Sequence, residues 1–336
     1  MVKVAINGFG RIGRLVFRIM ESDPDFDIVA INDLTDAEQL AYLLKYDTNH
    51  RLYKPNEISF DDDNIIVSGK KIRVFKETDP SNLPWKELEI DEVFECTGHF
   101  TDKESAMAHI NAGAKHVIIS APAKGDMKTV VYNVNHDILD GTEQIISTAS
   151  CTTNCLAPVV KVVDDNFKIV KGYMTTVHAY TNDQTILDVA HKKGIKARRG
   201  RAGAMNIIPS STGAAKALGA VLPNLDGKLS GSAMRVPTAT GSVIDLTLEL
   251  SKNVSAEEIN KVLENNTSET LKITYDPVVS SDIIGSDCGA LVDGLLTEVL
   301  EVDDKQLVKV IAWYDNEMGY SYQMVRTAKH LSKLGL

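Results

Sequence analysis

The feature that most constrains this chain is a glycine-rich turn near its start, the segment NGFGRIG. It follows the strand-like run VKVAI and opens the helix-like run RIGRLVF, and its glycines have the G-x-G-x-x-G spacing of Gly8, Gly10 and Gly13. The first such glycine permits a tight turn, the second lets phosphates approach the backbone, and the third allows the helix to pack closely on the strand. A pyrophosphate would meet the amides and the positive end of the helix dipole near Arg11 and Ile12.

An acidic residue lies at the distance that such a turn requires. The second strand-like run, DIVAIND, ends at Asp33, twenty residues after Gly13. A carboxylate there binds the adenosine ribose hydroxyls of a dinucleotide and repels a 2′-phosphate, which favours NAD over NADP. The alternative for Asp33 is a helix N-cap before the run DAEQL. The glycine spacing alone is a weak signal, but with the strand before it and the acid after it, it predicts a dinucleotide site.

Strand-like and helix-like runs alternate through the first half of the chain. Later examples are the helical DAEQLAYLLKYD, the hairpin NIIVSGKKIRVF, the strand DEVFECTG, the helical TDKESAMAHINAG and the strands KHVIIS and QIISTAS. Such alternation predicts an α/β fold with a doubly wound parallel sheet of the Rossmann type.

The pattern changes after Cys151, where longer strand candidates appear. They are YMTTVHAY, SVIDLTLEL, LKITYD and LVKVIAWYD, with the helical runs STGAAKALGAVL and SAEEINKVLENN between them. This predicts an α+β domain with a mostly antiparallel sheet. We expect an NAD-binding domain over 1–150, a catalytic and substrate domain over 151–315, and a C-terminal helix over 316–336 that packs back on the first domain.

Composition restricts the partners and the compartment. A net charge of −10 disfavours nucleic acid as the main partner, because neutralising phosphates requires a basic face. The first residues show no signal-peptide pattern, and no apolar run approaches the length of a membrane span. The four cysteines are too few for a disulfide scaffold, which indicates free thiols in a reducing, cytoplasmic setting. They are Cys96, Cys151, Cys155 and Cys288.

One cysteine lies where a strand passes into a helix, in the segment STASCTTNCLAP. Cys151 closes the strand and precedes the helix, a position that favours thiolate over thiol, so we expect its pKa to lie below the usual value of about 8.5. A nucleophilic cysteine also needs a base, and His178 in TTVHAYT is a candidate, although a lone histidine is more often structural. Cys155, one helical turn further on, is better interpreted as a small buried residue. The sequence shows no cluster of metal ligands.

Six motifs together resemble one known family. INGFGRIGR, ASCTTNCLAP, TTVHAYT, IIPSSTGAAKA, RVPTATGS and WYDNEMGYS occur in the order and spacing of the phosphorylating glyceraldehyde-3-phosphate dehydrogenases, and most resemble their bacterial, NAD-linked glycolytic branch. The resemblance covers essentially the whole chain. It implies oxidation of glyceraldehyde 3-phosphate with NAD and inorganic phosphate, through a thiohemiacetal and a thioester on Cys151 with His178 as base. It also implies a homotetramer.

The resemblance implies two anion pockets. Thr181 and Arg235 would bind the substrate's phosphate, and Arg198 matches a family arginine placed near it. The attacking phosphate would be bound by Ser150, Thr152, Thr212 and Gly213. For the STG segment the alternative is an ordinary helix cap before AAKALG, which is compatible with phosphate binding.

Two further positions would contact the nicotinamide half of the cofactor. The resemblance assigns Ser120 to its ribose and Asn316 to its carboxamide. The sequence departs from several NAD-specific relatives of this family at Ala190, where they have a proline that helps to exclude a 2′-phosphate. Asp33 still favours NAD.

Other functions remain open on the sequence alone. Erythrose-4-phosphate dehydrogenase is a related alternative with the same nucleophile and base, in which the acyl-enzyme goes to water. A non-catalytic binding module is another alternative. The basic run HKKGIKARRGR, residues 191–201, is interpreted as a solvated loop or as a nucleic-acid contact, and in the family this segment is a loop at the subunit interface.

Overall fold

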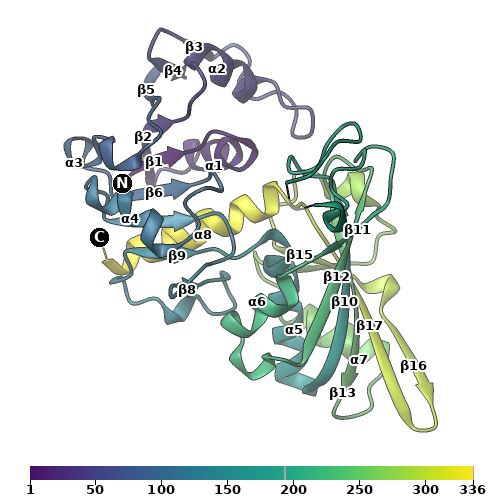
Figure 1. Ribbon diagram of the computed structural model, residues 1–336. Coiled ribbons are helices and arrows are strands. Elements are labelled where there is room, and N and C mark those ends of the chain that lie inside the picture. The colour runs from purple at the N-terminus through teal and green to yellow at the C-terminus, as the bar shows by residue number, and fades with distance from the viewer. Residues whose placement is uncertain (193, 336) are drawn as a thin grey trace. The chain divides into compact units, whose positions relative to one another are not determined.

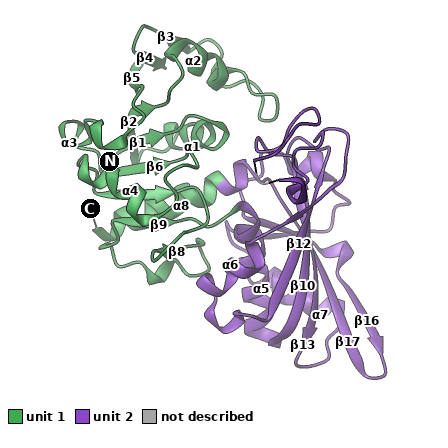
Figure 2. Ribbon diagram, viewed as in Figure 1, with its two compact units in different colours: residues 1–150, 321–336 green, residues 151–320 purple. Residues whose placement is uncertain are grey.

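The computed structural model describes residues 1–192 and 194–335, which divide into two compact units. The first unit comprises residues 1–150 and 321–336, and the second comprises residues 151–320 (Figure 2). The chain therefore leaves the first unit at Ser150 and returns to it within its last helix. Figure 1 shows the elements of both units.

The described residues of the first unit form a nine-stranded sheet in the order β3-β4-β5-β2-β1-β6-β7-β9-β8. All neighbours from β5 to β8 are parallel, and β3 and β4 add an antiparallel edge. This confirms the predicted doubly wound sheet and the hairpin, whose turn is Ser68–Gly69 with positive φ at both residues. The strands are β1 Val2–Asn7, β2 Phe26–Asn32, β3 Ile58–Phe60, β4 Asn64–Val67, β5 Lys70–Phe75, β6 Glu92–Glu95, β7 His116–Ile119, β8 Lys128–Thr129 and β9 Ile145–Ser147.

Two apolar clusters cover the two faces of this sheet. Alternate residues of β6 point to opposite faces, so Phe94 joins one cluster and Val93 the other. The Phe94 cluster includes residues of α1, α2 and the last helix, α8, among them Met324 and Leu331. The helices and short 3-10 segments of this unit are α1 Arg11–Glu21, α2 Ala37–Lys45, η1 Pro80–Asn82, α3 Trp85–Leu88, α4 Lys103–Asn111, η2 His136–Ile138 and the part of α8 (Met318–Gly335) from residue 321.

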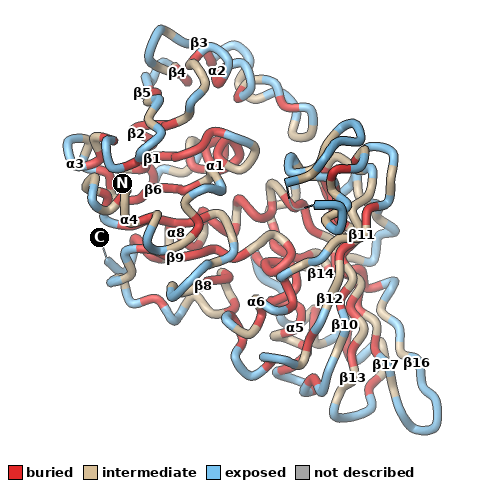
Figure 3. Tube along the Cα trace, viewed as in Figure 1, coloured by how far each residue is buried: buried red, intermediate tan, exposed pale blue. Residues whose placement is uncertain are grey.

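The second unit contains an eight-stranded sheet among its described residues, in the order β11-β12-β10-β13-β17-β15-β14, with β16 paired to β17. Most neighbours are antiparallel, as predicted, and the exceptions are the parallel pairs β10 with β12 and β14 with β15. Figure 3 shows β16 largely exposed. The strands are β10 Ile169–Ala179, β11 Ile208–Ser211, β12 Leu229–Val236, β13 Ser242–Leu250, β14 Leu271–Thr274, β15 Ala290–Asp293, β16 Glu298–Val302 and β17 Lys305–Tyr314.

One helix of the second unit, α7, begins at a side-chain cap. Ser255 and Glu258 form a reciprocal capping box at the start of α7. The long helix α5 begins directly at Cys151, and most of its residues are buried. The helical segments are α5 Cys151–Phe167, η3 Ile195–Ala197, α6 Ala214–Val221, η4 Pro223–Leu225, α7 Ala256–Asn265, η5 Ser280–Ile283 and η6 Gly294–Leu296. None of the helices that the structure describes has the length and apolar character needed to cross a lipid bilayer.

One buried carboxyl in β6 predicts an unusual dependence of stability on pH. Glu92 is 0% exposed, and neither of its side-chain oxygens has a hydrogen-bond partner among the described residues. Burial therefore raises the pKa of this carboxyl well above its usual range. Because the folded-state pKa exceeds the unfolded value of about 4.3, its contribution to stability is complete below pH 4.3 and is lost as the pH rises toward the folded pKa.

We therefore expect Glu92→Leu to raise the free energy of unfolding at pH 8 by about 1–3 kcal/mol, since it replaces an unpaired buried polar group with an apolar side chain of similar size. Urea unfolding of both proteins between pH 5 and pH 9 measures the effect. The matched control is Glu95→Leu in the same strand, which should destabilise, because the Glu95 carboxylate accepts hydrogen bonds from Asn7 and Thr97. Loss of stability in both variants would contradict the prediction.

Candidate active site

A thiol and an imidazole from two elements of the second unit face each other. Cys151 is the first residue of α5, and His178 lies next to the end of β10. The Sγ atom of Cys151 lies 3.4 Å from Nε2 of His178. His178 pairs in register with Arg235 of the parallel strand β12, so the guanidinium reaches the same place from the neighbouring strand. The structure thus brings together three of the residues that the sequence singled out.

The hydrogen bonds around His178 define which of its nitrogens carries the proton. One amino nitrogen of Arg235 lies 2.9 Å from the carbonyl oxygen of Ala179 and 2.9 Å from the hydroxyl oxygen of Thr181. These two oxygens accept both of its hydrogens. Nδ1 of His178 lies 2.7 Å from the same Ala179 carbonyl oxygen, which can only accept, and 3.0 Å from the Arg235 amino nitrogen, which can only donate. Because both hydrogens of that amino nitrogen are directed at the two oxygens, we assign the ring proton to Nδ1, which donates it to the carbonyl oxygen. The lone pair of Nε2 is therefore directed at the Cys151 sulfur.

The pKa values of this pair correct one prediction. Burial raises the pKa of the Cys151 thiol, and the opposing effects of the Arg235 charge and the Thr152 hydrogen bonds do not offset it. Burial and then the Arg235 charge lower the pKa of His178 to about 3. The expected lowering of the cysteine pKa at the helix start is thus wrong, because burial of the sulfur outweighs these opposing effects and the neighbouring neutral imidazole supplies no positive charge. The pair consists of a neutral thiol and a neutral base.

A second arginine extends the positive charge of the site. Arg199 pairs with Asp183, which also accepts a hydrogen bond from Thr181. Its charge contributes to lowering the pKa values of both His178 and Arg235. Arg198, the residue that the sequence analysis assigned here, is exposed instead. The two arginines are adjacent in an irregular loop, and no periodic pattern in the sequence indicates which one faces the site.

The other candidate phosphate ligands lie at helix starts or next to the cysteine. The hydroxyl of Thr152 is buried and lies 2.9 Å from the hydroxyl of Tyr314. Thr212 accepts a hydrogen bond from the amide of Ala214 at the start of α6, whose N-cap residue is Gly213, without a side-chain cap. A side chain at Gly213 would meet open space, so its backbone is accessible to a ligand. Ser150 is the last residue of the first unit's main segment and is partly exposed.

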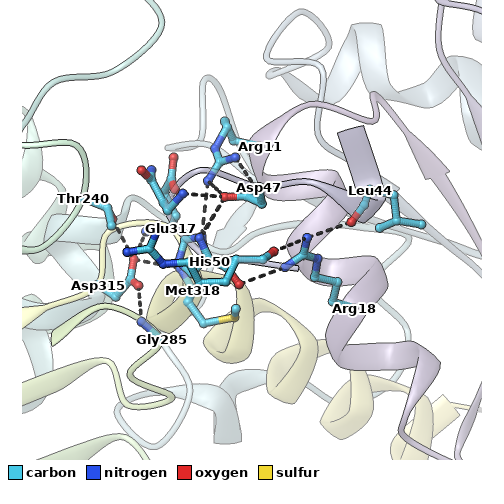
Figure 4. Close-up of polar contacts among 12 residues, drawn as sticks. Arg11, Arg18, Leu44, Asp47, His50, Thr240, Gly285, Asp315, Glu317 and Met318 are labelled. Carbon is cyan, nitrogen blue, oxygen red and sulfur yellow. Dashed lines mark hydrogen bonds and ion pairs between the residues drawn. The ribbon is translucent and has the colours of Figure 1, made fainter. Parts of the chain in front are cut away.

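Asn316 presents its amide in a fixed orientation. Its Oδ1 accepts hydrogen bonds from the amide of Gly241 at 3.2 Å and from the hydroxyl of Ser242 at 2.8 Å. A backbone amide can only donate, so Oδ1 must face this turn and the NH₂ group must point away from it. The neighbouring Asp315 accepts from Thr240 and from the amide of Gly285 (Figure 4). Both side chains of the dipeptide Asp315–Asn316, directly after β17, are thereby held in place.

The glycine turn of the first unit has the shape that a dinucleotide requires. Gly8 has a φ of +90°, and a side chain on it would lie 2.7 Å from the amide nitrogen of Thr97. A side chain on Gly13 would lie 2.1 Å from the Gly8 carbonyl oxygen, so helix α1 packs directly on the turn. Around Gly10, in contrast, no atom lies within 4 Å of a built side chain, and a ligand has access to the backbone. The residues present fit a pyrophosphate at the start of α1.

The acid after β2 is held in place at the same edge of the sheet. The Asp33 carboxylate accepts hydrogen bonds from the amides of Phe9 at 2.8 Å and Thr35 at 3.0 Å. The N-cap of the next helix is Asp36, so the alternative of a helix cap at Asp33 is wrong. Arg11 at the start of α1 pairs with Asp47 (Figure 4), while Ile12 packs partly buried against the core.

A buried polar network beneath this edge was not found from the sequence. The Glu95 carboxylate accepts hydrogen bonds from Asn7, from the amide of Thr97 and from the ring of His109, whose Nδ1 accepts from Trp85. Ser120, at the end of β7, donates its amide hydrogen to the Glu95 carbonyl oxygen. The strands β1 and β6 are adjacent, and the strand order reverses there, which is where such folds bind ligands. The only hint of this network in the sequence was the segment CTG, which follows directly after the strand EVFE.

Of the remaining candidates, Cys155 is fully buried, as predicted, with its sulfur 3.8 Å from the carbonyl oxygen of Ala312. Among the residues that the structure describes, no group of histidine, cysteine and acidic side chains could hold a metal ion. In the basic run, Lys193 lies outside the described residues, and Lys196, Arg198 and Arg199 line a cavity together with residues 209–211.

Comparison with known proteins identifies relatives over the whole chain. A family model described as the glyceraldehyde 3-phosphate dehydrogenase NAD binding domain matches residues 2–103, and the C-terminal domain of the same family matches residues 150–316. The chain is 55% identical to glyceraldehyde-3-phosphate dehydrogenase of Clostridium pasteurianum over 334 residues, 99% of each chain. The corresponding enzymes of Clostridium acetobutylicum and Streptococcus pyogenes are 54% and 53% identical, again over 99% of each chain.

Proposed function

Because this chain belongs to the glyceraldehyde-3-phosphate dehydrogenase family, we propose that Cys151 and His178 carry out the family's reaction in it. The substrates are D-glyceraldehyde 3-phosphate, NAD and inorganic phosphate, and the products are 1,3-bisphosphoglycerate and NADH. The observation that carries the assignment of roles is the 3.4 Å approach of Sγ to an Nε2 whose lone pair faces it. A thiol next to a correctly oriented base is the arrangement that nucleophilic catalysis requires.

The first steps use only the thiol and the imidazole. Sγ of Cys151 attacks the aldehyde carbon while Nε2 of His178 takes the thiol proton, and the imidazolium returns that proton to the new alkoxide to give a thiohemiacetal. Nε2 then takes the hydroxyl proton as the carbon–hydrogen bond breaks, which leaves a thioester. When bound, NAD supplies the hydride acceptor for this step. The backbone amide of Cys151 and the His178 ring stabilise the charge on the substrate oxygen.

Phosphate completes the reaction at the same sulfur. An oxygen of inorganic phosphate attacks the thioester carbon, the carbon–sulfur bond breaks, and Sγ leaves as a thiolate that regains a proton. Thr152, Thr212, Gly213 and Ser150 bind this phosphate in our proposal, which the accessible backbone at Gly213 supports. Arg235 and Thr181 bind the phosphate of the aldehyde, which their mutual hydrogen bond supports.

The cofactor is NAD, and we assign its contacts residue by residue. Gly10, Arg11 and Ile12 bind the pyrophosphate at the start of α1, and Asp33 binds the adenosine ribose. Ser120 lies at the carboxyl end of β7 and is assigned to the nicotinamide ribose. The outward NH₂ group of Asn316 donates to the nicotinamide carboxamide. Residues 1–150 with the C-terminal helix then form the NAD-binding domain, and the remainder binds substrate.

The experiment that tests this function follows NADH formation at 340 nm from the purified protein, NAD and glyceraldehyde 3-phosphate, with and without inorganic phosphate. We expect steady turnover that requires phosphate and is faster with NAD than with NADP. A single burst equal to the number of sites, with steady turnover independent of phosphate, would instead indicate the erythrose-4-phosphate reaction.

The two adjacent arginines give a specific prediction about substrate affinity. We propose Arg199 in place of Arg198 as the second phosphate-binding arginine, because its charge reaches both His178 and Arg235. Arg199→Gln should raise KM for glyceraldehyde 3-phosphate or for inorganic phosphate about 10- to 100-fold, the range for a lost charge-assisted hydrogen bond. The matched control Arg198→Gln should change neither KM more than about 3-fold. A larger rise in KM for Arg198→Gln than for Arg199→Gln would show that Arg198 is the phosphate-binding arginine.

We also propose that the protein is a cytoplasmic homotetramer. Three apolar side chains of the loop after β10 are strongly exposed in the single chain, Ile186 at 84%, Ile195 at 96% and Met205 at 81%. Exposed apolar residues gathered in one loop are typical of an interface between subunits. Light scattering after gel filtration gives the mass directly, and a monomeric mass would exclude the tetramer.

A further inference from the structure

A buried serine connects the candidate base to the asparagine expected at the cofactor. Ser242, the first residue of β13, is 1% exposed. Its Oγ lies 3.1 Å from the amide nitrogen of Ala179 and 2.8 Å from Oδ1 of Asn316. Both partners belong to the second unit, and both are themselves buried.

The direction of each hydrogen bond is determined by its groups. The Ala179 amide can only donate, so Oγ of Ser242 accepts there. The hydroxyl's single hydrogen is then donated to Asn316, whose Oδ1 already faces this turn because of the Gly241 amide. The hydroxyl is therefore fully used, as donor on one side and as acceptor on the other.

The backbone of Ala179 is the link to the base. Its carbonyl oxygen accepts the Nδ1 proton of His178, and that bond directs the Nε2 lone pair at Cys151. Its amide points into Ser242. The hydroxyl thus holds the peptide unit that joins His178 to Ala179, and the next peptide unit provides the carbonyl oxygen that fixes the ring of His178.

We infer that Ser242 is a positioning residue that sets the orientation of the His178 imidazole and of the Asn316 amide together. The inference rests on the roles proposed above for His178 and Asn316. Without the hydroxyl, Asn316 loses its shortest hydrogen bond, and its Oδ1 is held only by the longer bonds from the Gly241 amide at 3.2 Å and the Thr240 hydroxyl at 3.4 Å. The orientation of its NH₂ group is then fixed less firmly. At the same time the peptide unit between His178 and Ala179 loses its hydrogen bond to Oγ of Ser242, and the ring of His178 is held less firmly.

The experiment compares the full-length protein with Ser242→Ala at both ends of this connection. NAD affinity is measured by isothermal titration calorimetry, and we expect the Kd to rise about 5- to 50-fold, the range for one lost hydrogen bond to a buried partner. The rate of Cys151 alkylation by iodoacetamide, without NAD, reports on the imidazole and should fall at pH 7. In steady state, KM for NAD should rise and kcat should fall, with KM for glyceraldehyde 3-phosphate unchanged.

The matched control is Ser251→Ala. Ser251 directly follows the other end of β13, about 30 Å along the strand at 3.3 Å per residue, and its hydroxyl donates to the Phe167 carbonyl oxygen. Ser251→Ala should leave NAD affinity and the alkylation rate unchanged while removing one hydrogen bond of similar length at an exposed position next to the same strand. Urea unfolding of both variants separates a general loss of stability from a local effect.

A double-mutant cycle decides whether Ser242 acts through Asn316. In an Asn316→Ala background, Ser242→Ala should change the Kd for NAD less than 2-fold, because the group that it orients is gone. Additive losses, or a change at only one end, would overturn the inference. Because calorimetry and alkylation do not depend on turnover, a wild-type protein without dehydrogenase activity would refute the proposed function and still leave these two results to decide the role of Ser242.

Discussion

Cys151→Ser is expected to abolish turnover, lowering kcat by at least about 10⁴-fold, because removing the nucleophile of a catalytic pair costs nearly the whole catalytic effect. A serine hydroxyl is far less acidic than a thiol, and the neighbouring base is itself weak, since burial and the Arg235 charge lower the pKa of His178 to about 3. The pair therefore cannot activate an alcohol. NAD affinity should change little, because the glycine turn and Asp33 lie in the first unit.

The matched control for this substitution lies one helical turn away. Cys155→Ser changes the same atom in the same helix, at a site where the sulfur is buried and lies 3.8 Å from a carbonyl oxygen. It should keep substantial activity and lose some stability. NADH formation and calorimetric NAD binding measure the two properties separately. Retained phosphate-dependent turnover in Cys151→Ser would remove the nucleophile assignment.

His178→Asn should lower kcat about 10²- to 10⁴-fold, the usual contribution of a general base. Asparagine keeps a donor near the Ala179 carbonyl oxygen but has no lone pair of comparable basicity to direct at the Cys151 sulfur. Alkylation of the thiol should slow as well, whereas Kd for NAD should stay within about 3-fold. Unchanged kcat in this variant would show that another group takes the proton.

The same substitution has a second, thermodynamic consequence. The folded-state pKa of His178 is about 3, below the unfolded value of about 6.5. A depressed pKa means that the unfolded chain binds the proton first, so this residue's contribution to stability is complete above about pH 6.5 and is lost progressively as the pH falls toward 3. His178→Asn should therefore flatten the decline of the unfolding free energy between pH 6.5 and pH 4. The exposed control His99→Asn should not.

The fold was largely predictable because its signals are local. The strand–turn–helix of residues 2–21 and the hairpin around Ser68–Gly69 each follow from turn chemistry and apolar periodicity within a few residues. The order of the strands in a sheet, in contrast, has no local signal in the sequence. The placement of β12 beside β10 in parallel, which brings Arg235 level with His178, depends on packing across the whole unit, and no local pattern encodes it.

The candidate site was predictable only in part for the same reason. Cys151 and His178 lie in segments with a readable position, a helix start and a strand end. Arg199 and Ser242 do not, because each acts through partners that are close only in the folded chain. The prediction that the pKa of Cys151 is lowered was wrong, because it considered the helix start without the burial of the sulfur in the second unit.

The return of the chain through α8 has a consequence for synthesis. The apolar cluster on one face of the first sheet includes Met324, Val325, Ala328 and Leu331, which are synthesised 174 or more residues after Ser150, the last residue of the unit's main segment. At roughly 5–20 residues per second, a nascent N-terminal segment waits on the order of 10–40 seconds without the part of this cluster that α8 supplies. The first unit to leave the ribosome is then the last to complete its core, and during that interval it is the natural client of a chaperone.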